Sequence, residues 1–109
     1  MHDILIRNGR ILDGTGAPEC KGDIAIQGDR VVAVGDVDTL SATHTIDATD
    51  HIVCPGFIDV HTHCGCKPNL NYLHQGVTLV VSGNCGSSLV DISSVPGRLE
   101  RSPSAVNMA

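Results

Sequence analysis

The chain has 109 residues, of which 41% are hydrophobic and 17% charged, a balance typical of one small globular domain rather than a disordered chain. Its formal net charge of −5, without any basic cluster, argues against nucleic acid or an anionic membrane as a partner. The start, MHDILIRNGR, lacks the apolar stretch of a signal peptide, and no apolar run approaches the roughly 18 residues of a membrane span. We therefore expect a cytoplasmic protein whose five cysteines are thiols or metal ligands, and the oligomeric state stays open.

Residues 1–55 are expected to form a small β domain of short strands and tight turns. Asn8-Gly9 and Gly28-Asp29 are both flanked by apolar runs, and both pairs suit a two-residue hairpin turn because they tolerate positive φ. Two further strands are expected at about 43–47 and 51–54. Strands at this spacing predict a mainly antiparallel β-sandwich or barrel-like sheet.

Residues 56–90 show a different pattern. A nearly continuous apolar run at 57–60 is typical of a strand covered on both faces in a parallel sheet. The stretch 68–75 (PNLNYLHQ) suits a short helix, and 77–82 (VTLVVS) is the most β-prone run of the chain. This order predicts a βαβ unit. The Ser- and Pro-rich residues 91–109 show no hydrophobic period and are expected to be a disordered tail.

The stretch GFIDVHTHCGC, at residues 56–66, sets two histidines one residue apart at the end of a predicted strand. Because alternate residues of a strand share a face, Asp59, His61 and His63 are expected on one side. Two such imidazoles can supply two ligands of a zinc-like ion, although an isolated His-X-His also occurs as a pair of surface histidines. Cys85 follows the next strand, and ligands of α/β proteins gather at the carboxyl ends of parallel strands. The candidate metal ligands are His61, His63 and Cys85.

Cys64 and Cys66 leave a second interpretation open, since HTHCGC contains four possible zinc ligands within six residues. In a continued strand these cysteines would face away from the histidines, and only a bend at Gly65 would bring the four together. We favour cysteines without a dedicated site, and their role stays open.

Three segments resemble the N-terminal part of the amidohydrolase superfamily: MHDILIRNGRILDGTG, DATDHIVCPGFIDVHTH and QGVTLVVSGNCG. Within it they look most like the N-acyl-D-amino-acid deacylases, or D-aminoacylases, over roughly residues 1–89. The resemblance implies a small β-sandwich attached to a zinc-carrying (β/α)8 barrel that hydrolyses the amide bond of small-molecule N-acyl-D-amino acids. It also implies that His61 and His63 are the metal pair of the first barrel strand and that Cys85 is a metal-ligand cysteine.

The fold expected is therefore mainly β: a small amidohydrolase-type β-sandwich domain over 1–55, the first βαβ of a truncated (β/α)8 barrel over 56–90, and a disordered tail over 91–109. A whole barrel takes about 200 residues or more, and the further ligands and catalytic aspartate implied by the resemblance would lie on later strands. No catalytic residue is assigned here, and we expect the isolated chain to bind zinc weakly or not at all and to be inactive. The alternatives are a non-catalytic β-sandwich that binds a metal or a partner, and a degenerate gene product.

Overall fold

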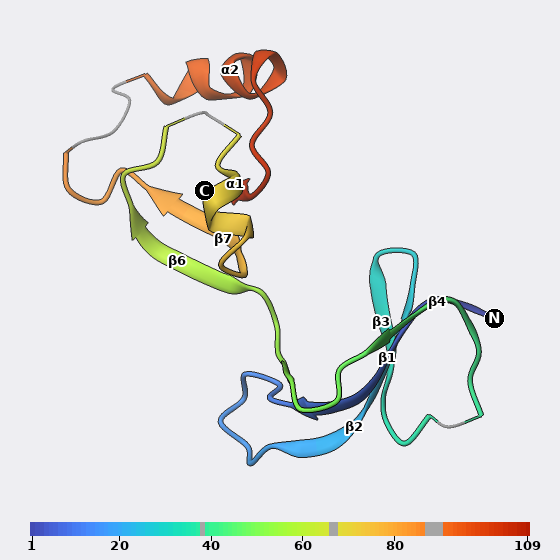
Figure 1. Cartoon of the computed structure of the whole chain (residues 1–109). Coiled ribbons are helices and arrows are strands. Elements are labelled where there is room, and N and C mark those ends of the chain that lie inside the picture. The colour runs from blue at the N-terminus through green and yellow to red at the C-terminus, as the bar shows by residue number, and fades with distance from the viewer. Residues whose placement is uncertain (38, 66–67, 87–90) are drawn as a thin grey trace. The chain divides into compact units, whose positions relative to one another are not determined.

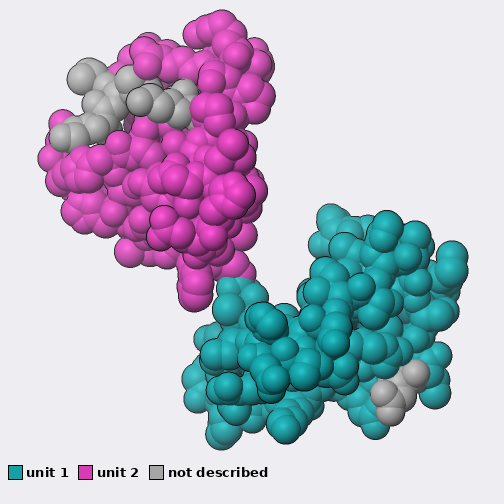
Figure 2. All heavy atoms as spheres, viewed as in Figure 1, with its two compact units in different colours: residues 1–55 teal, residues 56–109 magenta. Residues whose placement is uncertain are grey.

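The computed structural model describes residues 1–37, 39–65, 68–86 and 91–109, which divide into two compact units (Figure 1, Figure 2). Unit 1 is Met1–Pro55 and unit 2 is Gly56–Ala109. Strands predominate over helices, so the predicted mainly β class is confirmed. None of the described helices is both long enough and apolar enough to cross a membrane.

Unit 1 is a single five-stranded sheet in the order β3-β2-β1-β4, with β5 also pairing with β1. Its strands are β1 (His2–Ile11), β2 (Cys20–Gln27), β3 (Arg30–Gly35), β4 (Ala42–Asp47) and β5 (Ile52–Val53). Antiparallel pairing joins β1 to β2 and β2 to β3, whereas β4 and β5 run parallel to β1. The sheet is therefore mainly antiparallel, as predicted, with two parallel pairings that arise because the connection after β3 crosses to the far side of β1. The described strands of unit 1 all belong to this one sheet.

The pair Asn8-Gly9 does not form the predicted hairpin turn. Strand β1 runs through both residues, and its pairing with β2 shifts register between Ile6 and Gly9. Asn8 has a φ of 63°, so the conformation that suits a turn is used here for an irregularity within a strand. The second pair is a two-residue turn between β2 and β3 as predicted, with Gly28 at a φ of 60°.

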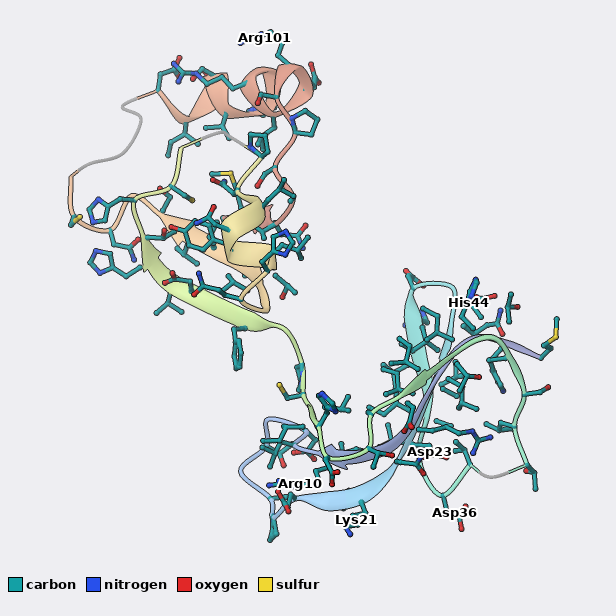
Figure 3. The ribbon with its side chains drawn as sticks, viewed as in Figure 1. Arg10, Lys21, Asp23, Asp36, His44 and Arg101 are labelled. Atoms are coloured by element: carbon teal, nitrogen blue, oxygen red, sulfur yellow. The ribbon has the colours of Figure 1, made fainter. Side chains whose placement is uncertain are left out.

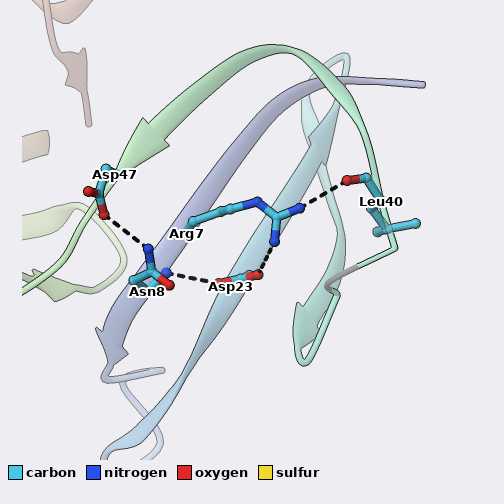
Figure 4. A network of polar contacts seen from close by, with 5 residues as sticks. All are labelled: Arg7, Asn8, Asp23, Leu40 and Asp47. Atoms are coloured by element: carbon cyan, nitrogen blue, oxygen red, sulfur yellow. Dashed lines mark hydrogen bonds and ion pairs between the residues drawn. The ribbon is translucent and has the colours of Figure 1, made fainter.

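Polar contacts around Asn8 explain why the strand continues (Figure 4). Its backbone N–H donates to Oδ1 of Asp23 at 2.8 Å, and its side-chain amide donates to Asp47 at 3.1 Å. The other carboxylate oxygen of Asp23 accepts from Arg7 at 3.0 Å, and Arg7 also donates to the carbonyl of Leu40 at 3.0 Å. Asp23 is buried, and these bonds satisfy its carboxylate. The network ties β1 to β2 and to β4 where the register shifts.

The two faces of the sheet in unit 1 are both apolar. Leu5, Ala25 and Val37 form a buried cluster on one face. Alternation along β1 and β2 sends Ile6 and Ile24 to the opposite face, where they line an apolar hollow of about 350 Å³. The strands therefore have apolar residues at consecutive positions rather than a strict alternation.

Unit 2 contains a three-stranded parallel sheet in the order β6-β7-β8. Its elements are β6 (Phe57–Thr62), α1 (Leu70–Leu73), β7 (Val77–Ser82), the 3₁₀ helix η1 (Ile92–Ser94), α2 (Val95–Arg101) and β8 (Asn107–Met108). The predicted βαβ unit is confirmed as β6, α1 and β7. The helix is shorter than the predicted range, because Asn69 has a φ of 52° and cannot be part of a right-handed helix.

Strand β6 is exposed, contrary to the expectation of a strand covered on both faces. Phe57, Ile58 and Val60 are 58%, 60% and 66% exposed. Within the described part of unit 2, β6 is an edge strand that pairs with β7, and Thr62 at its end is its one buried residue. The buried centre of this sheet is instead Val80 in β7, with no exposed surface.

Residues 91–109 carry η1, α2 and β8, so the predicted disordered tail is contradicted. The Asp91 side chain accepts from the backbone of Ser93 at 3.0 Å, and a proline occupies the first turn of α2. Val106 is buried, and the backbone of Ala109 bonds both Val80 and Ser82. The prediction of disorder rested on composition, which does not reveal these short capping signals. It also does not reveal that the last residues supply hydrogen-bond partners to the backbone of β7.

Candidate metal centre

The carboxyl ends of β6 and β7 lie at the same edge of the parallel sheet. Phe57 pairs with Val77 at the start of the two strands, and Thr62 pairs with Ser82 at their end. His61 is the penultimate residue of β6, and His63 follows the strand directly. Cys85 lies in the turn after β7. The topology therefore carries all three residues to one edge, as the sequence predicts.

The side chains of His61, His63 and Cys85 form one compact group. One possible ligand atom from each residue lies within 4.8 Å of the others. The Cys85 Sγ atom is 3.3 Å from Nε2 of His63, and the two imidazole rings have centroids 5.6 Å apart. All three residues are exposed, so the group can be reached from solvent.

The donor set fits zinc. Two imidazole nitrogens and one thiolate supply three of the four ligands of a tetrahedral site, and the fourth position is that of a water or a substrate in catalytic zinc centres. Zn–N and Zn–S bond lengths imply ligand atoms roughly 3.3–3.6 Å apart in such a tetrahedron. The separation of 3.3 Å between Cys85 and His63 already meets this spacing, and the whole group lies within 4.8 Å.

Two hydrogen bonds hold the end of β6, one made by Thr62 and one by Asp59. Thr62, which lies between His61 and His63 in the sequence, is buried. Its hydroxyl lies 2.7 Å from the phenol oxygen of Tyr72 in α1. The Asp59 carboxylate accepts from the backbone N–H of His61 at 3.2 Å. Asp59 therefore contacts the backbone of a candidate ligand.

The turn that carries Cys85 is built from two glycines and an asparagine. Gly83 and Gly86 have φ values of 95° and 78°, which residues with a Cβ rarely adopt. Between them, the side-chain amide of Asn84 donates to the carbonyl of Val60 at 2.9 Å. This bond spans the two strands, and sequence reasoning missed it because nothing in a local pattern indicates a partner 24 positions away.

The second metal-binding interpretation concerned Cys64 and Cys66. Cys64 is half-buried and has no place in the group formed by His61, His63 and Cys85. Cys66 lies outside the described residues.

Unit 1 contains a polar groove of about 620 Å³ that the sequence does not reveal. Arg10, Lys21, Asp23 and Asp36, labelled in Figure 3, are among its lining residues. Two of its charged side chains are engaged in structural contacts: Arg10 pairs with Glu19 at 2.8 Å, and Asp23 belongs to the network around Asn8. The hydrogen bond with Glu19 raises the pKa of Arg10 above its ordinary value. These contacts account for two of the charges of the groove, those of Arg10 and Asp23, without a ligand.

Known proteins are similar to this chain in both sequence and fold. Over 91 residues it is 43% identical to an N-acyl-D-glutamate deacylase of Alcaligenes xylosoxydans xylosoxydans, covering 79% of this chain and 19% of that protein. The crystal structure of an N-acyl-D-glutamate deacylase from Bordetella bronchiseptica, complexed with zinc and a phosphonate inhibitor that mimics the tetrahedral intermediate, matches with a TM-score of 0.86. That match has 33% identity and covers 99% of this chain and 28% of the other.

A D-aminoacylase structure, described for the functional role of its binuclear metal centre, matches with a TM-score of 0.84 and 33% identity, over 100% of this chain and 29% of the other. No family model matches the chain. Sequence and fold together define this chain as part of an amidohydrolase. It belongs to the D-aminoacylase-type amidohydrolases and corresponds to an N-terminal part of them. It spans about a fifth of the length of the sequence relatives and 28–29% of the matched structures.

Proposed function

We propose that this chain contributes the small β domain and the first metal-bearing strands of a zinc-dependent enzyme that hydrolyses the amide bond of N-acyl-D-amino acids. The observation that carries the proposal is the meeting of His61, His63 and Cys85 at one edge of the β6–β7 sheet. Relatives with this fold are N-acyl-D-glutamate deacylase and D-aminoacylase, and one was crystallised with zinc. When bound, zinc would polarise the amide carbonyl and lower the pKa of a bound water.

In this proposal the roles of the chain's residues are limited to holding the metal. His61 and His63 offer imidazole nitrogens, and Cys85 offers a thiolate, all on the exposed edge of the sheet.

We also propose a cytoplasmic location, since the exposed thiol of Cys85 would stay reduced there. The substrate would be a small-molecule N-acyl amino acid, the class named for the relatives.

The 109 residues by themselves are proposed to bind zinc weakly and to be inactive. Among the described residues, no fourth histidine, cysteine or carboxylate joins the group of three. All three side chains are exposed, and holding them in place costs conformational entropy that few packing contacts offset. With no acid or base beside the proposed ion, nothing in the described chain would move a proton during amide hydrolysis.

A chimera tests the proposal. The matched segment of the Alcaligenes N-acyl-D-glutamate deacylase is replaced by residues 1–89 of this chain, and zinc-dependent release of D-glutamate from N-acetyl-D-glutamate is measured. We expect the chimera to be active and His61→Ala to lower its rate by more than the roughly 10- to 100-fold typical of losing a residue that only supports a metal ligand. His74→Ala, at the exposed end of α1, is the matched control and should leave the rate unchanged.

Two outcomes would count against the proposal. A folded, zinc-loaded chimera without activity would favour a non-catalytic module, and an active chimera that tolerates His61→Ala would remove the histidine from the metal site. For the isolated chain, zinc-dependent hydrolysis abolished by His61→Ala would show that the 109 residues suffice and would contradict the proposed inactivity.

A further inference from the structure

The side chain of Asn84 crosses from the turn after β7 to the end of β6. Its Nδ2 donates to the carbonyl oxygen of Val60 at 2.9 Å, and Val60 directly precedes His61. The pairing register of the two strands shifts between Asp59 and Thr62, so this bond occurs where the regular ladder is interrupted. A side chain thus supplies the link between the two segments that carry the candidate ligands.

The turn needs such a link because its backbone has few other constraints. Gly83 and Gly86, which flank Asn84 and Cys85, have positive φ values, and glycine at these positions allows many other conformations. Among the described residues, a Cβ at Gly86 would meet no atom within 4 Å. Among the contacts of the described residues, the hydrogen bond of Asn84 is therefore one that limits where Cys85 can lie.

We propose that Asn84 is a positioning residue of the metal centre: by donating to the Val60 carbonyl it holds the turn on the end of β6 and keeps the Cys85 thiol beside His63. The inference rests on the proposed zinc site of His61, His63 and Cys85. Asn84 itself touches none of the reacting groups. Its effect is transmitted through the backbone to the next residue, Cys85.

The probe is Co²⁺ alone, titrated into the reduced 109-residue chain to millimolar concentration. A bound cobalt ion with a thiolate ligand gives a near-ultraviolet charge-transfer band, so absorption reports both affinity and the presence of sulfur among the ligands. Cys85→Ser defines the spectrum without the thiolate. Asn71→Ala is the matched control, since Asn71 is an exposed asparagine of α1 in the same unit.

For Asn84→Ala we expect cobalt binding about 3- to 10-fold weaker, the effect of losing about one hydrogen bond, and a weaker thiolate band per bound ion. Asn71→Ala should retain the affinity and the band of the unmodified chain. If Asn84 only supported folding, Asn84→Ala would lower the stability of the chain but would leave the thiolate band per bound ion unchanged. The band therefore separates positioning of Cys85 from general support of the fold.

Asn84→Asp is the second variant, because it keeps the side-chain shape and removes the N–H donor. If the position of the Cys85 thiol did not depend on this donor, the added negative charge would only strengthen cation binding. If it does depend on the donor, the thiolate band becomes weaker. Amide exchange in β7 checks that each variant is folded. An unchanged band in folded Asn84→Ala and Asn84→Asp would overturn the inference while leaving the metal site intact. Absence of any thiolate band in the unmodified chain would overturn the proposed metal site itself, and the inference with it.

Discussion

The Sγ atom of Cys85 lies 3.3 Å from Nε2 of His63, although the two residues are 22 positions apart in the chain. They meet because β6 and β7 are parallel and end at the same edge of the sheet, so each strand delivers one ligand-bearing segment to that edge. A crossover connection through α1 is what makes the two strands parallel. The candidate metal centre is therefore a consequence of the βαβ topology rather than of any local cluster.

Gly56 is predicted to tolerate no side chain. A Cβ there would lie 2.8 Å from the Cβ of Thr78, a separation that rotation of the threonine side chain cannot relieve. We expect Gly56→Ala to destabilise unit 2 by about 1–3 kcal/mol, measured by amide exchange in β7. The control is Gly97→Ala in α2, where a Cβ would have 3.6 Å to its nearest neighbour and alanine is the better helix former. Equal effects of the two substitutions would contradict the close packing of β6 on β7.

The contact between Thr62 and Tyr72 is predicted to stabilise the end of β6. Tyr72→Phe leaves the buried Thr62 hydroxyl without its partner, which typically costs about 1–3 kcal/mol. Adding Thr62→Val should recover part of that loss, because the double variant no longer buries an unpaired hydroxyl. Free energies of opening from amide exchange, compared in a double-mutant cycle, measure this. Strictly additive effects would mean that the two hydroxyls are not coupled.

Acid should weaken unit 1 partly through Asp47. Hydrogen bonds from Thr49 and Asn8 hold the pKa of the Asp47 carboxyl below its ordinary value. A carboxyl with a lowered folded-state pKa stabilises the fold above its unfolded pKa, about 3.9, and that contribution is lost as the pH falls through the folded pKa. Between pH 5 and pH 2, unit 1 should therefore lose less stability in Asp47→Asn than in the unmodified chain.

The control for this pH dependence is Asp29→Asn in the β2–β3 turn. The Asp29 side chain is 95% exposed, and asparagine suits the same turn. Chemical denaturation monitored by amide exchange in β1 and β4 at each pH gives the comparison. If Asp47→Asn loses stability on acidification as steeply as Asp29→Asn, Asp47 does not contribute in the proposed direction.

The last residues of the chain are predicted to be ordered. Val106 is buried, and Ala109 bonds the backbone of β7 at Val80 and Ser82 with distances of 2.9 Å. Backbone relaxation should give order parameters near the rigid value of about 0.85 for residues 106–108. Values below about 0.6 would instead support the disorder that the composition of residues 91–109 predicts.

Elements with a strong periodic pattern could be predicted from the sequence, and irregular ones could not. The hairpin at Gly28-Asp29 and strand β7 were predictable, because the turn residues and the β-branched run each have one favoured structure. Asn8-Gly9 was misread because its φ preference fits both a turn and a strand irregularity, and a contact to Asp23, 15 positions away, decides between them. Such a contact leaves no trace in the local pattern.

The candidate site also has a part that could be predicted from the sequence and a part that could not. His61 and His63 follow a recognisable strand, and strand parity sets them on one face. Cys85 was predicted to lie near the two histidines because the strand before it was expected to run parallel to their strand. The structure has this parallel pairing of β6 and β7. The amide of Asn84 could not be predicted, because its bond to Val60 depends on how the turn after β7 folds back towards β6.

Calorimetric titration of zinc into the reduced chain tests the metal centre most directly. We predict one-to-one binding with a dissociation constant in the micromolar range or weaker, abolished by His61→Ala and by Cys85→Ser and unchanged by Cys64→Ser. Zinc binding that survives loss of His61 and of Cys85, or that requires Cys64, would contradict the site described here.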